Sequence, residues 1–559
     1  MKKILFLFSF LIFSPLFSQQ EEAWLFLKDK PNKDSFLENP LTMLTQRALD
    51  RREIQNIALD SLDVPVDENY YNQLKNESTI TVLAKSKWLN AVHVIATESQ
   101  INDLITNYTF IDHIEFANKS LNRSGKKQQK TITPNHHQKF NEIETTFVYG
   151  DSENQIKMLK GEFLHEQGLT GGNQHIAVID AGFPNVNTLA AFKRLRDNNQ
   201  ILGGYDFVER KAEFYTGHNH GTNVLSTIGG YLEDEFVGSA PDAFFYLFRT
   251  EDASREVPLE ESLWVEAAER ADSLGVDVIN TSLGYTTFDE AKYNYSYADM
   301  DGKTTFISRG AEIGSSRGML LVVSAGNEGN KDWKYISAPA DATSVITVGA
   351  VDASGNIAGF SSYGPSSDGR IKPEILAQGQ NPALINHTTG EVVTTSSGTS
   401  FSGPIIAGLI ACLNQQLPAF IKSSGKKSSD TNYHTNLKRG VYESADKYSN
   451  PLEQHGYGIP NFEVAQQIYF SLYPASVNDN LLSDFSIYPN PVNNSFIIDS
   501  KNLNIEEFNI QIYTILGKKV VEKSKIFTNT IDVSYLESGI YLLKIQKGNQ
   551  HKTLKLIKN

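Results

Sequence analysis

The chain contains one cysteine in 559 residues, Cys412. Because a disulfide needs two thiols, none can form within the chain, and its stability cannot depend on oxidation. Cys412 lies in the apolar run IIAGLIACL. We therefore expect a buried structural thiol rather than a reactive one.

Positive charge does not predominate either: the 51 lysines and arginines are outnumbered by 65 aspartates and glutamates, which gives a formal net charge of -14. A nucleic acid partner would need a basic surface to match its phosphates, so we expect no partner of this class. The hydrophobic content of 40% is that of a globular chain. A chain of this length is expected to fold as about three domains.

Long apolar runs are absent after the N-terminus. There, Lys2 and Lys3 precede an apolar run at residues 4–13 and small residues at 14–18. This order predicts a secretory signal peptide over residues 1–18. The alternative is a membrane anchor, but the run is short for the ~30 Å of hydrocarbon in a bilayer. We therefore expect no transmembrane segment.

Residues 19–145 predict a small α+β unit followed by a linker. Strand patterns occur at residues 22–28, 80–84 and 88–96, and helical patterns at 40–56 and 99–107, the last with Ser99 as its cap. Residues 120–140 are basic and poor in apolar side chains. That composition indicates an exposed linker that is easily cut.

Residues 146–473 alternate between strand and helix patterns. The strand patterns are at 175–179, 276–280, 319–324 and 345–350, and residues 259–274 have helical periodicity. This alternation predicts a parallel sheet covered by helices on both faces. After a linker at 474–484, residues 485–559 carry short alternating strands that are typical of an antiparallel sandwich.

Two segments supply a hydroxyl and an imidazole. Ser400 precedes a helical run at residues 401–413, so unpaired N–H groups at that helix start would surround its hydroxyl. We expect Pro404 in the first turn, where its missing N–H costs little. His220 opens another helical run and is preferred to His218 as a base because glycine and threonine follow it directly. Alone, Ser400 is also explained as a helix cap, and a lone histidine is more often an ordinary surface or core residue.

Two further segments supply a carboxylate and an amide. Asp180 ends an apolar strand, at the edge where open α/β sheets place their sites. Asn327 follows a buried strand, and its side-chain amide could donate to an oxyanion. Alone, Asp180 is also explained as a loop cap and Asn327 as a turn residue.

The four segments AVIDAGF, HGTNVLSTIGG, SAGNEG and GTSFSGP occur in an order that resembles the subtilisin-like serine proteases. GSAPDA, GVDVINTSLG, SSYGPSSDGRIKPEILAQG and HGYGIPNFEVA also match, so the resemblance covers about residues 150–470. It implies an α/β fold with a subtilisin-like parallel sheet and helices on both faces. A small α+β propeptide would precede it and an all-β sandwich would follow.

The resemblance also implies roles for individual residues. Asp180 would orient the imidazole, His220 would act as the base and Ser400 would attack the substrate. Asn327 and the Ser400 backbone N–H would form the oxyanion hole. The substrate-binding residues would be Ser282, Leu283 and Gly284, which pair with an extended peptide, and Ala325 and Gly326, which border the pocket for the residue before the cut.

The chain departs from the family at Asn223, Phe401 and residues 402–403, where the family often has His, Met and Ala-Ala. None of these positions supplies a catalytic atom. We expect that the chemistry requires no cofactor and no metal. The family often binds calcium, but no dense carboxylate loop in the sequence indicates a site.

The flanking units resemble two known modules. Residues 19–145 resemble the inhibitory propeptide of these proteases, with a cut expected between residues 118 and 149. Residues 485–559 resemble the C-terminal sorting domain of type IX secretion in Bacteroidetes-like bacteria, through SIYPNPVNNSFII, LGKKV and LESGIYLLKI. The alternative for this unit is a generic carbohydrate- or protein-binding sandwich.

We therefore expect a secreted or cell-surface serine endopeptidase that is made as a zymogen. Its expected partners are polypeptide substrates and the secretion machinery. Two alternatives stay open. One is a catalytically silent peptide-binding or scaffold protein on the same fold, and the other is a serine hydrolase that acts on a non-peptide ester.

Overall fold

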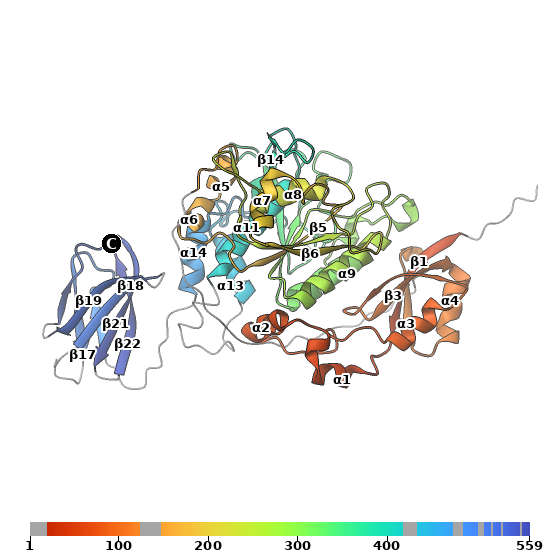
Figure 1. Cartoon of the computed structure of the whole chain (residues 1–559), viewed down its shortest axis with the longest axis horizontal. Coiled ribbons are helices and arrows are strands. Elements are labelled where there is room, and N and C mark those ends of the chain that lie inside the picture. The colour runs from red at the N-terminus through yellow and green to blue at the C-terminus, as the bar shows by residue number, and fades with distance from the viewer. Residues whose placement is uncertain are drawn as a thin grey trace, which may run out of the picture.

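The computed structural model describes residues 19–122, 147–416, 433–472, 485–500, 508–515, 518–526, 529–547 and 550–559 (Figure 1). The predicted signal peptide, the linker at 474–484 and residues 123–146 of the stretch expected to hold the propeptide cut lie outside these residues.

The first unit is a four-stranded antiparallel sheet with strand order β2-β3-β1-β4. Its strands are β1 (Gln20–Leu27), β2 (Thr81–Ser86), β3 (Ala91–Thr97) and β4 (Ile111–Phe116). Its helical segments are α1 (Lys33–Glu38), η1 (Pro40–Thr42), α2 (Gln46–Ile54), α3 (Glu68–Lys75), α4 (Glu98–Asn107) and η2 (Lys119–Leu121).

Both faces of this sheet are buried. Because side chains alternate along a strand, Leu25 and Leu27 of β1 pack with α3 and α4, whereas Trp24 and Phe26 point to the opposite face. That second face packs on two helices of the next unit, where the Trp24 ring stacks on Phe306 with 4.6 Å between ring centres. The first unit is therefore docked on the second through an apolar interface (Figure 1).

The start of α4 differs from the prediction. Thr97, not Ser99, is the cap: its hydroxyl accepts a hydrogen bond from the Gln100 N–H, and the Gln100 side chain accepts one from the Thr97 N–H. This reciprocal pair satisfies two N–H groups, so the helix begins before Ser99.

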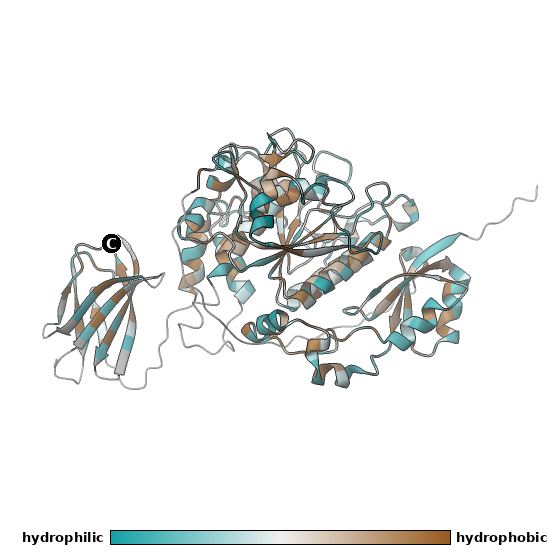
Figure 2. Cartoon of the chain, viewed as in Figure 1, coloured by the Kyte–Doolittle hydropathy of each residue, from teal (hydrophilic) through white to brown (hydrophobic). Residues whose placement is uncertain are grey.

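The second unit contains a seven-stranded parallel sheet with order β13-β12-β11-β10-β5-β9-β6. Its strands are β5 (His175–Asp180), β6 (Ile201–Asp206), β9 (Phe244–Arg249), β10 (Val278–Thr281), β11 (Leu320–Ser324), β12 (Ile346–Val351) and β13 (Ile375–Gln378). In β5, Ile176 and Val178 face one helical layer and Ala177 and Ile179 the other. The central strands are therefore largely hydrophobic (Figure 2).

Helices cover both faces of this sheet, as predicted. One layer contains α8 (His220–Gly229), α11 (Thr399–Gln415), α13 (Tyr433–Glu443) and α14 (Phe462–Ser471), and the other contains α9 (Leu259–Leu274) and α10 (Phe306–Ser316). The shorter elements are α5 (Glu153–Lys157), α6 (Gly161–Glu166), η3 (Ala190–Phe192), α7 (Lys193–Asp197), β7 (Tyr231–Leu232), β8 (Phe236–Val237), η4 (Ala291–Tyr293), η5 (Tyr297–Asp299), β14 (Leu384–Ile385) and β15 (Val392–Val393).

The last unit consists of two antiparallel sheets, β16-β17-β20 and β19-β18-β21-β22. Its strands are β16 (Phe485–Tyr488), β17 (Ser495–Ser500), β18 (Phe508–Thr514), β19 (Lys519–Ile526), β20 (Thr530–Asp532), β21 (Gly539–Lys547) and β22 (Gln550–Lys558). Phe496, Ile512 and Leu543 belong to one core that the two sheets share, which agrees with the predicted sandwich. Among the described residues, no helix has the length and apolar character needed to cross a membrane.

Candidate active site

Five residues singled out in the sequence gather at one edge of the seven-stranded sheet. Asp180 is the last residue of β5, Ser282 directly follows β10, and Asn327 comes shortly after β11. Because these strands run in parallel, their C-terminal ends meet at this edge. His220 and Ser400 lie at the N-terminal ends of α8 and α11, which reach the same edge.

Asp180 and His220 form a hydrogen-bonded pair. Nδ1 of His220 lies 2.8 Å from Oδ1 of Asp180, a residue that is 1% exposed. Burial alone would lower the pKa of His220, but the charge of Asp180 and this hydrogen bond outweigh it and raise the pKa above its ordinary value. The pair can therefore hold the imidazole in one orientation and stabilise its protonated form.

A glycine lets the helix that carries His220 approach Asp180 closely. A Cβ atom at Gly221 would lie 2.5 Å from the carbonyl oxygen of Gly182 and 2.9 Å from Cβ of Asp180, so no larger residue fits. The competing histidine, His218, forms no hydrogen bond with Asp180 in the described part of the chain. Its Nδ1 instead accepts a long hydrogen bond from the His220 N–H at 3.3 Å.

Ser400 faces the same cavity as His220. Its hydroxyl donates to the carbonyl oxygen of Ser282 at 3.4 Å, and among the described residues it forms no hydrogen bond with His220. Ser400, His220, Asn327 and Phe401 all line one cavity of about 460 Å³. A change of the Ser400 side-chain rotamer is therefore the motion that would turn its hydroxyl toward the imidazole.

Pro404 lies inside α11, not in its first turn as predicted. A helix normally pairs each N–H with the carbonyl four residues earlier, and proline has no N–H to give. The carbonyl of Ser400 accepts a hydrogen bond from the Ser282 hydroxyl at 3.0 Å instead. The Ser282 hydroxyl therefore replaces the N–H donor that Pro404 lacks.

The side chain of Asn327 is fixed by Thr399. Its Oδ1 accepts hydrogen bonds from the Thr399 N–H at 2.8 Å and from the Thr399 hydroxyl at 3.1 Å. Its Nδ2 has no hydrogen-bond acceptor among the described residues, and Asn327 lines the cavity beside Ser400. The amide can therefore donate into that cavity.

Ser282 and Leu283 line a second cavity of about 440 Å³, which also reaches Asp180 and His220. The neighbouring Gly284 has no room for a side chain, because a Cβ atom would lie 2.2 Å from Oγ of Ser337. Ser282 and Leu283 of the predicted substrate edge therefore lie beside the Asp180–His220 pair, and the edge carries no side chain at Gly284.

Ala325 and Gly326 connect β11 to Asn327. Ala325 is fully buried, and the N–H of Gly326 donates to the Thr399 hydroxyl at 3.1 Å. Gly326 adopts φ +104, and a Cβ atom there would lie 2.9 Å from Oγ of Ser362. Both the backbone conformation and the lack of space require glycine at this position.

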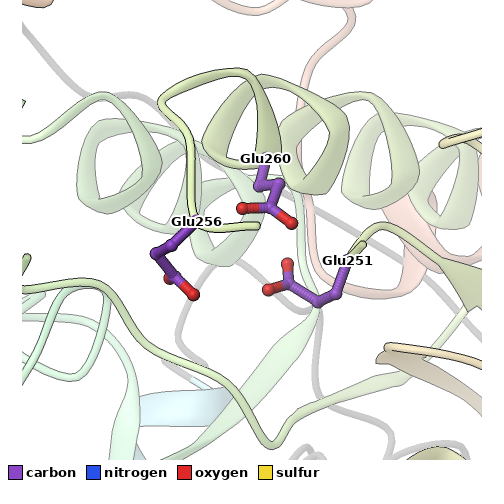
Figure 3. Close-up of side chains that lie close together, drawn as sticks. All are labelled: Glu251, Glu256 and Glu260. Atoms are coloured by element: carbon purple, nitrogen blue, oxygen red, sulfur yellow. The ribbon is translucent and has the colours of Figure 1, made fainter. Parts of the chain in front are cut away.

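The structure brings together three glutamates that the sequence analysis did not single out. Glu251 follows β9, Glu256 lies in the next loop and Glu260 lies in the first turn of α9. Their carboxylates point toward one another, with a ligand oxygen of each within 4.8 Å of the others (Figure 3). Glu251 and Glu256 also line the cavity that holds His220. The acid-rich run TEDASREVPLEES was the available signal.

Burial is the main cause of the raised pKa values of these three glutamates. It raises the pKa of Glu256 to about 8 and that of Glu260 to about 7, and it also raises that of Glu251, which accepts a hydrogen bond from the Tyr285 hydroxyl. Clustered carboxylate oxygens are the ligands that Ca²⁺ prefers. Among the described residues, these three glutamates are therefore the first place to test for a bound cation. The absence of a metal site stays a prediction.

Comparison with known proteins assigns each unit to a family. A model described as the subtilase family matches residues 171–459. A model of the peptidase S8 propeptide domain of Bacteroidota matches residues 22–134, and a model of a secretion system C-terminal sorting domain matches residues 486–559. The three predicted resemblances are confirmed, whereas the exact domain boundaries stay predictions.

Similar proteins include a thermostable alkaline protease of Halalkalibacterium halodurans, 30% identical over 47% of this chain and 63% of that protein. Subtilisin DY of Bacillus licheniformis is 27% identical over 56% of this chain and 97% of its own length. Subtilisin E of Bacillus subtilis is 30% identical over 56% of this chain and 70% of its own length. The chain thus spans less than two thirds of the alkaline protease and nearly all of Subtilisin DY.

Proposed function

The chain belongs to the subtilase family, and from this premise we propose that it is a secreted serine endopeptidase made as a zymogen. It would hydrolyse peptide bonds with Asp180, His220 and Ser400. The observation that carries the proposal is the hydrogen bond of 2.8 Å between Asp180 and His220, beside a cavity that Ser400 and Asn327 also line.

In the proposed reaction, the Ser400 hydroxyl turns from the Ser282 carbonyl to His220 and attacks the carbonyl carbon of the scissile bond. His220 takes the hydroxyl proton, and Asp180 stabilises the imidazolium. The negative oxygen of the tetrahedral intermediate accepts hydrogen bonds from Nδ2 of Asn327 and the Ser400 N–H. His220 then protonates the leaving amine, and a water molecule hydrolyses the acyl-enzyme by the same route.

The substrate proposed is an extended polypeptide. Ser282 and Leu283 line the cavity that also reaches the Asp180–His220 pair, and Gly284 follows them directly. An extended chain can add to such an edge as another strand. Ala325 and Gly326 would border the pocket for the residue before the cut. The need for an extended backbone favours a peptide over a small non-peptide ester.

The two flanking units support a precursor that is inactive when made and a product that is exported. The propeptide match at residues 22–134 supports synthesis as an inactive precursor. The sorting-domain match at residues 486–559 indicates export to the outside of the cell or to its surface, and the secretion machinery would be its partner. A catalytically silent scaffold would need no functional hydroxyl at Ser400.

Labelling with a serine-directed phosphonate, together with casein cleavage, tests the proposal. The mature protein should be labelled at Ser400 and should degrade casein, and Ser400→Ala should abolish both. A folded, mature protein that takes no label and cleaves no casein would contradict the protease function. Labelling with hydrolysis of esters but not of casein would favour the hydrolase alternative.

A further inference from the structure

Two other segments of the chain hold the residues that precede His220. The first lies directly after β5, where residues 181–183 pair with residues 216–218 through backbone hydrogen bonds of 2.9 and 3.0 Å. A Cβ atom at Gly217 would lie 2.4 Å from the carbonyl oxygen of Ala181, so the two segments are in close contact. This contact joins the start of α8 to the end of the strand β5.

The second segment is the β14–β15 hairpin, residues 384–393, which packs on α8 (Figure 1). Leu384 is buried in the same core as Ile228 of α8. The Ile385 N–H donates to the hydroxyl of Ser226, a fully buried residue of that helix, at 3.1 Å. The base of the hairpin is therefore fixed to the helix that begins at His220.

Beyond its base, the hairpin brings His387 to the start of α8. Nδ2 of Asn219, the residue before His220, lies 2.7 Å from Nδ1 of His387. Because an amide nitrogen can only donate, Nδ1 of the neutral imidazole accepts this hydrogen bond and the ring proton lies on Nε2. Nε2 lies 3.0 Å from the Thr388 hydroxyl. Both nitrogens of the His387 ring therefore have a partner.

Asn219 occupies the N-cap position of α8, but its side chain does not cap the helix. At this position an asparagine side chain usually accepts a hydrogen bond from an N–H of the first turn. Here no such bond forms, and the Asn219 amide binds His387 instead. The amide therefore connects the start of the helix to a separate segment of the chain.

The position of His387 is fixed by its surroundings. Nδ2 of Asn185 donates to the His387 carbonyl at 2.9 Å. The preceding residue, Asn386, donates its N–H to the Glu391 carbonyl at 2.8 Å, and its Oδ1 accepts a hydrogen bond from the Thr388 N–H at 2.8 Å. His387 is therefore a fixed acceptor and not a freely rotating surface side chain.

His387 lies behind the candidate active site. Asn219 lines the cavity of about 460 Å³ together with His220 and Ser400. Among the described residues, none of the β14–β15 hairpin lines either cavity of the site. A residue that does not reach the cavity can affect the reaction only through a residue that does, and Asn219 is that residue.

We propose that His387 is a positioning residue: through Asn219 it holds the start of α8, and with it the imidazole of His220, in place between Asp180 and Ser400. This rests on the proposed function, since the position of His220 matters most if it acts as the base. Small displacements of reacting groups slow a reaction strongly, because the groups must meet in a near-attack geometry. Loss of the His387 acceptor should therefore slow the attack without weakening substrate binding.

Two variants separate the hydrogen bond of His387 from its volume. His387→Leu keeps a side chain branched at the same atom but has no polar atom, whereas His387→Asn keeps a polar atom where Nδ1 stands. In the mature protein, His387→Leu should lower kcat on a peptide substrate about fivefold with little change in KM. The rate of phosphonate labelling at Ser400 should fall by the same factor. His387→Asn should recover most of both losses.

The matched control is His455→Leu. His455 is another half-buried histidine of the second unit, its ring forms no hydrogen bond in the described part of the chain, and it lines neither cavity of the site. This change should leave kcat and KM as in the parent. Equal kcat values for the parent and His387→Leu, or equal losses in His387→Leu and His387→Asn, would overturn the proposal.

A spectroscopic measurement does not depend on whether the chain cleaves peptides. In the full chain with Ser400→Ala, the downfield proton NMR signal of the hydrogen bond between His220 and Asp180 reports on the imidazole. His387→Leu should shift or broaden this signal, whereas His387→Asn and His455→Leu should preserve it. An unchanged signal in His387→Leu would contradict the positioning role. A changed signal in a chain whose wild type cleaves no casein would support that role and contradict the proposed function alone.

A second variant covers the case in which His387→Leu does not fold. Asn219→Ala removes the donor of the same hydrogen bond and should lower kcat by a similar factor. Where both variants fold, their combination should lower kcat no further than the stronger single change, because both remove one interaction. Additive losses would show that His387 does not act through Asn219.

Discussion

Asp180 differs from the other carboxylates of the cleft in what it contacts. Its Oδ1 accepts hydrogen bonds from Nδ1 of His220 and from the Ala181 N–H at 2.7 Å, so its position is fixed from two sides. Glu251 and Glu256, in the same cavity, make no hydrogen bond with His220 in the described part of the chain. One carboxylate among several is therefore placed to act on the imidazole.

Asp180→Asn should lower kcat by about 10⁴-fold, since the amide cannot stabilise the imidazolium. Neutral His220 is the active form, so activity rises as pH increases through its pKa. Loss of the Asp180 charge lowers that pKa, and the acid limb of the kcat/KM profile should move to lower pH. Asp252→Asn, in the same cavity, is the control and should leave the profile in place.

Asn327→Ala should reduce kcat by roughly 10²–10³-fold with little change in KM, because its amide would act on the oxyanion only. Steady-state kinetics on a peptide substrate give both constants. Asn219→Ala removes another amide from the lining of the same cavity and should have a much smaller effect. Equal losses in kcat for the two variants would argue against an oxyanion role.

The conformation of the segment after β10 depends on the segment at residues 337–338, which lies beside it. Tyr285 and Ala338 exchange backbone hydrogen bonds at 2.8 and 3.2 Å, and Ser337 fills the space where a side chain of Gly284 would stand. A second segment therefore packs against the edge proposed for substrate. The geometry of this edge depends on the contact between Gly284 and Ser337.

Gly284→Ala should destabilise the protein by about 1–3 kcal/mol and raise KM, because the new methyl group must displace Ser337. Gly284→Ala combined with Ser337→Gly should recover much of both losses. Thermal unfolding in a Ser400→Ala background and peptide kinetics in the active background complete this double-mutant cycle. Additive effects of the two changes would rule out the proposed clash.

The molecule as a whole carries several buried carboxyl groups with raised pKa values. Burial is the main cause for Glu256 (about 8), Glu261 (about 7) and Asp341 (about 6). A folded-state pKa above the unfolded value favours folding at low pH. The corresponding stability is lost as pH rises from about 4.5 through these pKa values.

Thermal stability of the Ser400→Ala chain should therefore fall between pH 5.5 and 8.5. Glu256→Gln should stabilise the protein at pH 8.5 by about 2 kcal/mol, well below the full linkage value since the carboxyl is partly open to solvent. At pH 4.5 the variant and parent should melt alike. Melting curves at the three pH values decide this, and a destabilised variant at pH 8.5 would refute it.

The sequence predicted those parts of the fold and site that depend on local pattern. The strand ending at Asp180 and the helix starts at His220 and Ser400 follow from periodicity and from short motifs. Thr97 was missed as a cap because Ser99 fits the same rule. The contacts of residues 45–55 with the C-terminal ends of α9 and α10 could not be predicted, because their partners are distant in the sequence. Arg47 donates to the Gly275 carbonyl and Arg51 to the Val276 carbonyl, each more than 200 positions away.

The hydrogen bond from the Ser282 hydroxyl to the Ser400 carbonyl has a mechanical consequence. It connects the backbone that would receive a peptide to the backbone that carries the attacking hydroxyl. The bond is made at the Ser400 carbonyl, which has no N–H donor within α11 because residue 404 is proline. A peptide that adds to this edge would bind to backbone that is hydrogen-bonded to the segment carrying the proposed nucleophile. A displacement of Ser282 on binding would therefore also displace Ser400.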